Sequence, residues 1–277
     1  MTDVTLSGAT RSALFATQRT ATLAQQTSER IATGLRVTQA ADNAPAFFAA
    51  QSLSSRAGGL LALKNGINQG ISTISGALSG IGSITDIANQ LKGIAIAARG
   101  GSADARSAAA AQFDALRAQI DSLAGDVEFN GINLIAASPD SLTVPFSESG
   151  ASSLTVSGVA SDAASLGIGT AAGSFNNFAS DADIDDAIAG LDQAIGTLRS
   201  TSSTLGSNAG VLNTRLDFTQ DLANTLQSGA GNLVNADLNE EAAKLLSLRL
   251  RGELNLIGQS IANENQQAIL QLFRGLS

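Results

Sequence analysis

The end of the chain carries apolar residues on two faces of one predicted helix, from Asn235 to Arg274. Leu238, Ala242, Leu245 and Leu256 mark one face, and charged residues such as Glu241 and Arg249 between the faces exclude a membrane span. The other face is a stripe at helical spacing made of Ala243, Leu246, Leu250, Leu254, Ile257, Ile261, Ala268 and Leu272, with Phe273 beside its end. Because one partner helix covers only one face, the pattern predicts that this helix is completed by contact with other molecules.

A second amphipathic helix is predicted at the start of the chain, from Leu6 to Leu35. Its periodic positions are mostly small residues, which let another backbone approach closely. Among these periodic positions, we assign to assembly the residues Leu14, Ala21, Ile31 and Leu35. Gly34 and Pro45 interrupt the pattern, and Pro45 suits the first turn of the next helix.

Between these ends, two long stretches repeat apolar residues at alternating spacings of four and three, the pattern of helices that pack in a bundle. The predicted core positions are Ile67, Ile71, Ile74, Leu78, Ile81, Leu191, Ile195, Leu198, Leu205, Leu212 and Leu216. We interpret Gly76 and Gly80 as a site of close helix packing, and we expect the second stretch to end at Gly229-Ala230-Gly231. A shorter helix is expected from Asp104 to Gly125.

Residues 136–180 are rich in Ser, Thr, Gly and Ala, and they contain short alternating segments. Leu142, Val144 and Phe146 alternate, as do Leu154 and Val156, so a β-hairpin with Pro145 near an edge is expected. The acidic run after Ser180 lacks the Gly and Glu of a calcium loop, and a helix N-cap is the better interpretation. The predicted fold is mainly α: long antiparallel heptad helices in a bundle, paired terminal helices and a small β region.

Composition narrows the function. The chain has no Cys and no His among its 277 residues, which removes disulfides, thiolate metal sites and the commonest general base. We therefore expect no catalytic residue, no metal and no cofactor. The net charge of −8 argues against nucleic acid, and no stretch is apolar enough for a membrane helix. The first residues carry no basic or apolar region, so no Sec signal peptide is expected.

Three groups of short motifs then resemble flagellin, the subunit of the bacterial flagellar filament. The N-terminal group is Arg30-Ile-Ala-Thr-Gly-Leu-Arg-Val37 followed by residues 40–44. Residues 112–120 and Phe129-Asn-Gly-Ile-Asn-Leu134 match the segment before the family's hairpin. Residues 236–243 and Gln271-Leu-Phe-Arg274 match its last helix. Their order and gaps extend the resemblance over nearly the whole chain.

The resemblance implies an inner coiled coil made from residues 1–44 and 235–277. It implies a surrounding bundle from residues 45–234, with a short β region at 136–180 in place of large outer domains. It also implies an extracellular homopolymer for motility, exported unfolded through the flagellar type III channel. The partners would be the export apparatus, a flagellin chaperone, and the hook-associated and cap proteins.

Two other functions remain open at this point. The hook–filament junction protein shares paired terminal helices, and a type III secretion translocator is a more distant alternative. An enzyme would need a catalytic group that the sequence does not supply.

A host receptor is the last expectation from the resemblance. Toll-like receptor 5 recognises many flagellins through charged residues on the inner N-terminal helices. Here those positions are held by Gln90, Gly93 and Gln112. Because charged anchors often dominate an interface, weak or no recognition is expected.

Overall fold

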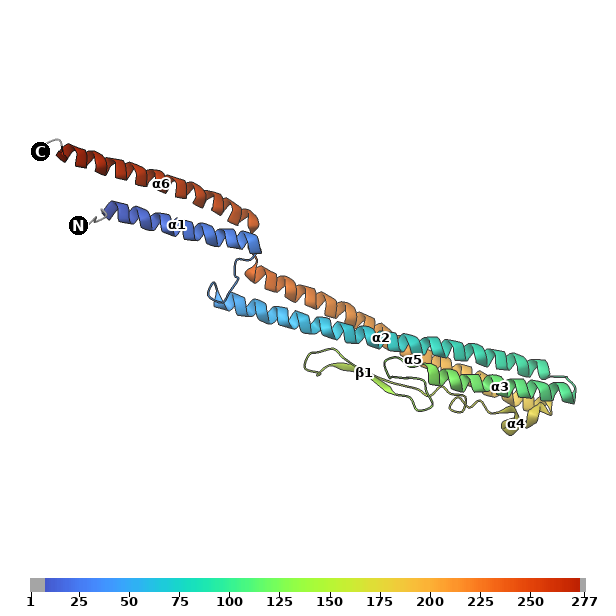
Figure 1. The fold of residues 1–277 in the computed structure, drawn as a ribbon. Helices are drawn as coiled ribbons and strands as arrows, with labels where there is room; N and C mark the ends of the chain where they lie inside the picture. The colour runs from blue at the N-terminus through green and yellow to red at the C-terminus, as the bar shows by residue number, and fades with distance from the viewer. Residues whose placement is uncertain (1–7, 275–277) are drawn as a thin grey trace. The chain divides into compact units, whose positions relative to one another are not determined.

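The computed structural model describes residues 8–274, which are mainly α-helical (Figure 1). The elements are α1 (Gly8–Thr33), α2 (Ala44–Ala98), α3 (Ala103–Asp126), β1 (Ser141–Pro145), β2 (Ser153–Ser157), α4 (Ala171–Ser174), the 3-10 turn η1 (Asn176–Phe178), α5 (Asp181–Val234) and α6 (Leu238–Arg274). The predicted fold class is confirmed: long helices with a small antiparallel hairpin.

The chain divides into two compact units. One comprises residues 56–225, and the other joins the two ends of the chain, residues up to 55 and from 226 onward. In the first unit α2 and α5 run antiparallel, since Lys64 contacts Gln220 while Lys92 contacts Asp192. This pairing follows from the two heptad repeats, each of which places one apolar line toward the other helices.

The core of this unit lies between α2, α3 and α5. Predicted positions that are fully or almost fully buried are Ile67, Ile74, Ile81, Leu191, Ile195, Leu198, Leu205 and Leu212. Ile71, Leu78 and Leu216 are partly buried against the same cluster. Sequence reasoning missed Ile84 and Leu91, which are completely buried. They continue the line of Ile74 and Ala77 at heptad spacing, a signal that was present in the sequence.

The hairpin packs on α2 at a glycine. The predicted hairpin is confirmed, and β1 pairs with β2 so that Leu142 lies opposite Val156 and Val144 opposite Leu154. A Cβ at Gly70 would lie 2.7 Å from Val144 Cγ2, so a larger residue there would force the hairpin side chain to shift.

Two local expectations were wrong. Gly80 does not serve helix packing: a Cβ there would meet Val127 Cγ2 at 2.6 Å and Ile135 Cδ1 at 2.8 Å, and both belong to the segment after α3. A Cβ at Gly76 would meet no atom within 4 Å. The helix predicted from the second heptad stretch also does not end at Gly229–Gly231, because this helix, α5, continues to Val234. Ala230 is buried there, and that packing outweighs the weak helix propensity of the flanking glycines.

The N-cap interpretation of the acidic run is confirmed. Ser180 Oγ accepts from the backbone N–H of Asp183 at 3.3 Å, and Asp183 Oδ2 accepts from the backbone N–H of Ser180 at 2.8 Å. This reciprocal pair is a capping box with Asp in the third position, and it satisfies amide groups that α5 leaves open at its start.

Candidate assembly surfaces

The two terminal helices α1 and α6 lie side by side, drawn blue and red in Figure 1. The positions of α1 that face α6 are heptad-spaced and small: Thr10, Ala13, Thr17, Thr20, Ala24 and Thr27. On α6 they are Glu241, Leu245, Leu248, Gly252, Asn255 and Gln259. Asn255 Nδ2 donates to Thr20 Oγ1 at 3.4 Å, so this seam is close but largely polar.

The predicted apolar stripe of α6 points away from that seam. Leu246 is 71% exposed and Leu250 57% exposed, whereas Leu248, which the sequence pattern did not single out, is 6% exposed. Leu254, Ile257 and Ile261 are exposed as well. A helical turn of 100° per residue places this stripe opposite Leu248, so the intramolecular partner cannot cover it. The side chains of Leu272 and Phe273 lie outside the described residues.

The second predicted face is also mostly open. Leu238 and Leu256 are at least half exposed, and only Leu245 turns partly toward α1. On α1, Leu14 and Ala21 are exposed, and Phe15 is 69% exposed. Sequence reasoning missed Phe15, whose position next to Leu14 was the available signal. The pair of helices thus presents apolar side chains on several sides.

A groove of about 600 Å³ runs beside the seam between these helices. Leu248 forms part of its floor, and its apolar edges include Phe15, Leu23 and Leu254. Arg19 and Arg251 also line it. The groove can therefore accept an apolar side chain that has a carboxylate near it.

A polar turn connects the end of α1 to the start of α2 and lies against the junction between α5 and α6. Arg30 forms an ion pair of 3.3 Å with Glu241, whose carboxylate is almost completely buried. The backbone N–H of Arg36 donates to Val234 O at 2.7 Å, and Leu35 forms an isolated bridge with Asn235. The predicted assembly residues Ile31 and Leu35 are half-buried in this junction, unlike Leu14 and Ala21.

Asp42 closes this turn. Its Oδ2 atom accepts hydrogen bonds from the backbone N–H of Thr38 at 2.9 Å, the Thr38 hydroxyl at 2.9 Å and the backbone N–H of Gln39 at 3.1 Å. These bonds favour the ionised carboxylate, the backbone bond from Thr38 most strongly, and they lower the pKa of Asp42 below its ordinary value of 3.8.

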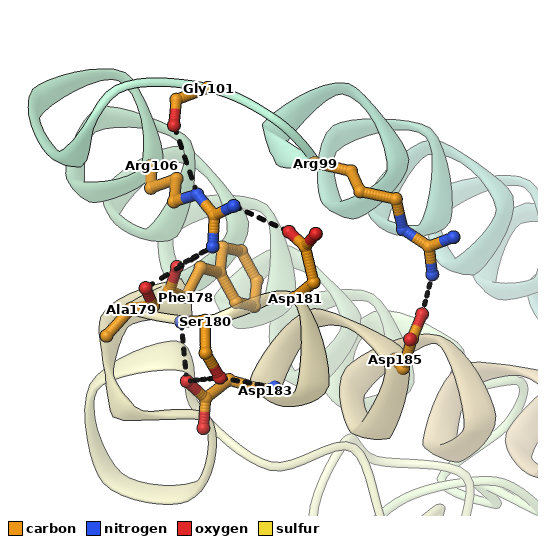
Figure 2. A network of polar contacts seen from close by, with 9 residues as sticks. All are labelled: Arg99, Gly101, Arg106, Phe178, Ala179, Ser180, Asp181, Asp183 and Asp185. Carbon is orange, nitrogen blue, oxygen red and sulfur yellow. Dashed lines mark hydrogen bonds and ion pairs between the residues drawn. The ribbon is translucent and has the colours of Figure 1, made fainter.

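Arg106 holds together the end of the bundle where α5 begins (Figure 2). Its guanidinium donates to Gly101 O at 3.2 Å, to Phe178 O and Ala179 O at 3.3 Å each, and to Asp181 Oδ1 at 2.5 Å. Arg99 pairs with Asp185 one turn further along α5. Phe178, buried against Phe113, has a positive φ of 60°, which this packing and the bonds to Arg106 stabilise.

The three positions compared with the receptor-binding surface are all exposed. Gln90 and Gly93 lie on α2, and Gln112 lies on α3. The nearby Lys92 is engaged by Asp192 of α5 at 2.5 Å.

Neither a metal centre nor a membrane segment stands out among residues 8–274. No group of His, Cys, Asp and Glu in that range is arranged to hold a metal ion. None of the described helices combines the length and the apolar character needed to cross a membrane.

Fold and surface together define an α-helical protein whose ends pair with each other and leave apolar side chains for other molecules. Residues 6–140 match the bacterial flagellin N-terminal helical region. Flagellin FljM of Caulobacter vibrioides is 35% identical over 251 residues, which cover 90% of both chains. The flagellin of Brucella melitensis is 28% identical over 258 residues, 91% of this chain and 92% of that relative. The crystal structure of Bacillus cereus flagellin aligns with a TM-score of 0.48 at 22% identity, over 56% of this chain and 88% of that chain.

The chain belongs to the flagellin family. It is a short flagellin, a structural subunit that polymerises into the extracellular filament of the bacterial flagellum. Of the functions left open by the sequence, the filament subunit is therefore preferred over the junction protein and the translocator.

Proposed function

We propose that the exposed apolar residues of α1 and α6 are the surface through which copies of this chain contact one another in the filament. The carrying observation is the contrast on α6: Leu246, Leu250 and Leu254 are more than half exposed, while Leu248 is buried against α1. Exposed leucines at this density on one helix are costly in water unless another surface covers them. A second copy supplies such a surface at every position of a polymer.

The test is a charge placed on the stripe. Leu250→Asp should raise the critical concentration for polymerisation by about a hundredfold or more, because an unpaired buried carboxylate costs several kcal/mol. Asn265→Asp is the matched control: it adds the same charge at an exposed position of α6 that continues the line of Lys244 and Arg251, off both apolar faces, and it should polymerise normally. The monomer stability of both variants should equal that of the unmodified chain. Normal polymerisation of Leu250→Asp would refute the assignment.

We further propose that different segments of the chain form different layers of the filament. Residues 1–44 and 235–277 would form the inner coiled coil, and residues 45–234 the surrounding bundle with its β region at 136–180. Export would proceed unfolded through the flagellar type III apparatus with a dedicated chaperone, followed by contacts with hook-associated and cap proteins. The family supports this proposal, as does the absence of Cys, since no disulfide can form before export. We assign the chain no enzymatic activity.

For the host receptor we propose weak or absent recognition by Toll-like receptor 5. The exposed positions Gln90, Gly93 and Gln112 lack the charges expected there, and loss of one charged anchor commonly costs about 2 kcal/mol, or about thirtyfold in affinity. In a reporter-cell assay, the monomer should need at least about thirtyfold more protein than a receptor-competent flagellin. The Gln90→Arg/Gly93→Glu variant should recover part of the response. Full activation by the unmodified chain would contradict the proposal.

A further inference from the structure

The chain contains the tetrapeptide Asn-Gly-Ile-Asn twice, in two different backbone settings. The first copy, residues 65–68, lies within the long helix α2. The second copy, residues 130–133, forms the turn after α3. Asn65 and Asn130 are both exposed, and neither side chain makes a hydrogen bond within the described residues. The two sites therefore share chemistry and solvent access but differ in how firmly the backbone is held.

An asparagine followed by glycine can lose its side-chain amide without any enzyme. The glycine N attacks Cγ of the asparagine, the N–Cγ bond forms, the Cγ–Nδ2 bond breaks, and ammonia leaves with the proton from the glycine N–H. Water then adds to one of the two carbonyls of the cyclic imide and opens the ring to aspartate or to isoaspartate. Glycine permits the attack because it has no Cβ to crowd the nitrogen.

We propose that Asn130 is a site of spontaneous deamidation in the folded chain, and that Asn65 is protected. The turn at Asn130 is closed by two backbone hydrogen bonds, Phe129 N–H to Ile132 O at 3.0 Å and Ile132 N–H to Phe129 O at 3.1 Å. Within the described residues the N–H of Gly131 donates no hydrogen bond. The left-handed conformation of Asn130, with φ of 52°, must change for the attack, and opening this short turn is sufficient.

The same rotation at Asn65 is much more expensive. Gly66 lies inside α2, where each N–H donates to the carbonyl four residues earlier. Its neighbour Ile67 is completely buried in the core of the bundle. Freeing the Gly66 nitrogen therefore requires local unfolding of the central part of α2, which costs far more than opening a surface turn.

The two products affect the turn differently. Aspartate tolerates the left-handed conformation, so it leaves the turn intact and adds one negative charge. Isoaspartate inserts an extra carbon into the main chain of a two-residue turn, which disrupts the pairing of Phe129 with Ile132. The next residue, Asn133, anchors this segment to α3 by donating to Ala124 O at 2.8 Å. Isoaspartate therefore loosens the segment that buries Leu134 and Ile135 beside α2.

The experiment compares the two sites within one molecule. The full chain is incubated folded at mildly alkaline pH, and deamidation of the peptides containing Asn65 and Asn130 is followed by mass spectrometry. Asn130 should react at least about tenfold faster, since the opening free energies differ by more than about 1.4 kcal/mol. In concentrated urea the two sites should react at similar rates. Equal slow rates in the folded chain, or the same tenfold contrast in urea, would overturn the proposal.

Two variants test the attack by the Gly131 nitrogen and the effect of isoaspartate on the turn. Gly131→Asn keeps a residue that tolerates the observed φ of 77° but adds a Cβ, so reaction at Asn130 should slow by about tenfold or more. An unchanged rate would rule out attack by this nitrogen. Asn130→Asp should show the same amide exchange at Leu134 and Ile135 as fresh protein, whereas aged protein rich in isoaspartate should exchange faster there. Equal exchange in aged and fresh protein would refute the stated effect on the turn.

Discussion

A single carboxylate organises the passage from α1 to α2. Gly34, with a φ of 71°, ends α1 in a conformation that suits glycine. The carboxylate of Asp42 then accepts three hydrogen bonds, two from Thr38 and one from Gln39. Sequence reasoning located the interruption from Gly34 and Pro45. It did not foresee the role of Asp42, because a hydrogen bond back across four residues leaves no periodic signal.

The lowered pKa of Asp42 gives this turn a defined pH dependence. A carboxyl group whose pKa is lower in the folded state stabilises that state above its ordinary pKa, and the contribution is lost as the pH falls through the folded value. The Asp42 carboxyl should therefore titrate below 3.8, and the amide proton shifts of Thr38 and Gln39 should follow the same midpoint by NMR. In Asp42→Asn this acid transition of the amides should disappear. A midpoint at or above the ordinary value would contradict the assignment.

At the scale of the elements, the bundle was easier to predict than the terminal pair. Heptad repeats in α2 and α5 identified core positions such as Ile74 and Leu198, because the buried positions of these helices carry apolar residues that follow the repeat. In α6 the same reasoning found the stripe through Leu250 but not the side that faces α1. That side has only two leucines, Leu245 and Leu248, and its other positions are small or polar, so hydropathy does not distinguish it from a solvated face.

Glycines of α2 have roles that their sequence spacing does not reveal. Gly70 and Gly80 admit the hairpin and the segment after α3, whereas Gly76 faces open space. All three glycines lower helix propensity by about the same amount. Glycine is therefore required only where residues from another segment lie close to its Cα.

A matched pair of alanine substitutions separates these roles. Gly76→Ala should stabilise the chain by about 0.5–1 kcal/mol, because alanine loses less backbone entropy in a helix. Gly80→Ala gains the same propensity but places a methyl group 2.6 Å from Val127 Cγ2, and such overpacking costs about 1–3 kcal/mol. Urea denaturation should therefore rank Gly76→Ala above Gly80→Ala by at least about 1 kcal/mol. Equal stabilisation by both would show that the segment after α3 yields freely.

At the scale of the whole molecule, the residues that hold the fold and those that we propose to contact other copies belong to different units. The bundle of residues 56–225 contains most of the fully buried side chains, including Phe113 and Phe178, and its ion pairs join α2 and α3 to α5. The terminal unit has few buried apolar residues, and its α1–α6 seam is mostly small or polar. Its stability therefore depends more strongly on neighbours in the polymer.

Removal of residues 238–277 tests this separation. The truncated chain should remain a monomer at concentrations where the full chain forms filaments, because the exposed stripe of α6 is gone. The bundle should keep its stability within about 0.5 kcal/mol, since none of the α6 side chains that the structure describes belongs to its core. Electron microscopy after seeding would measure assembly, and amide exchange at positions such as Ile74, Ile84 and Leu198 would measure the bundle. Filaments from the truncated chain would place the essential contacts elsewhere, and lost protection at those amides would show that the bundle does not fold independently of α6.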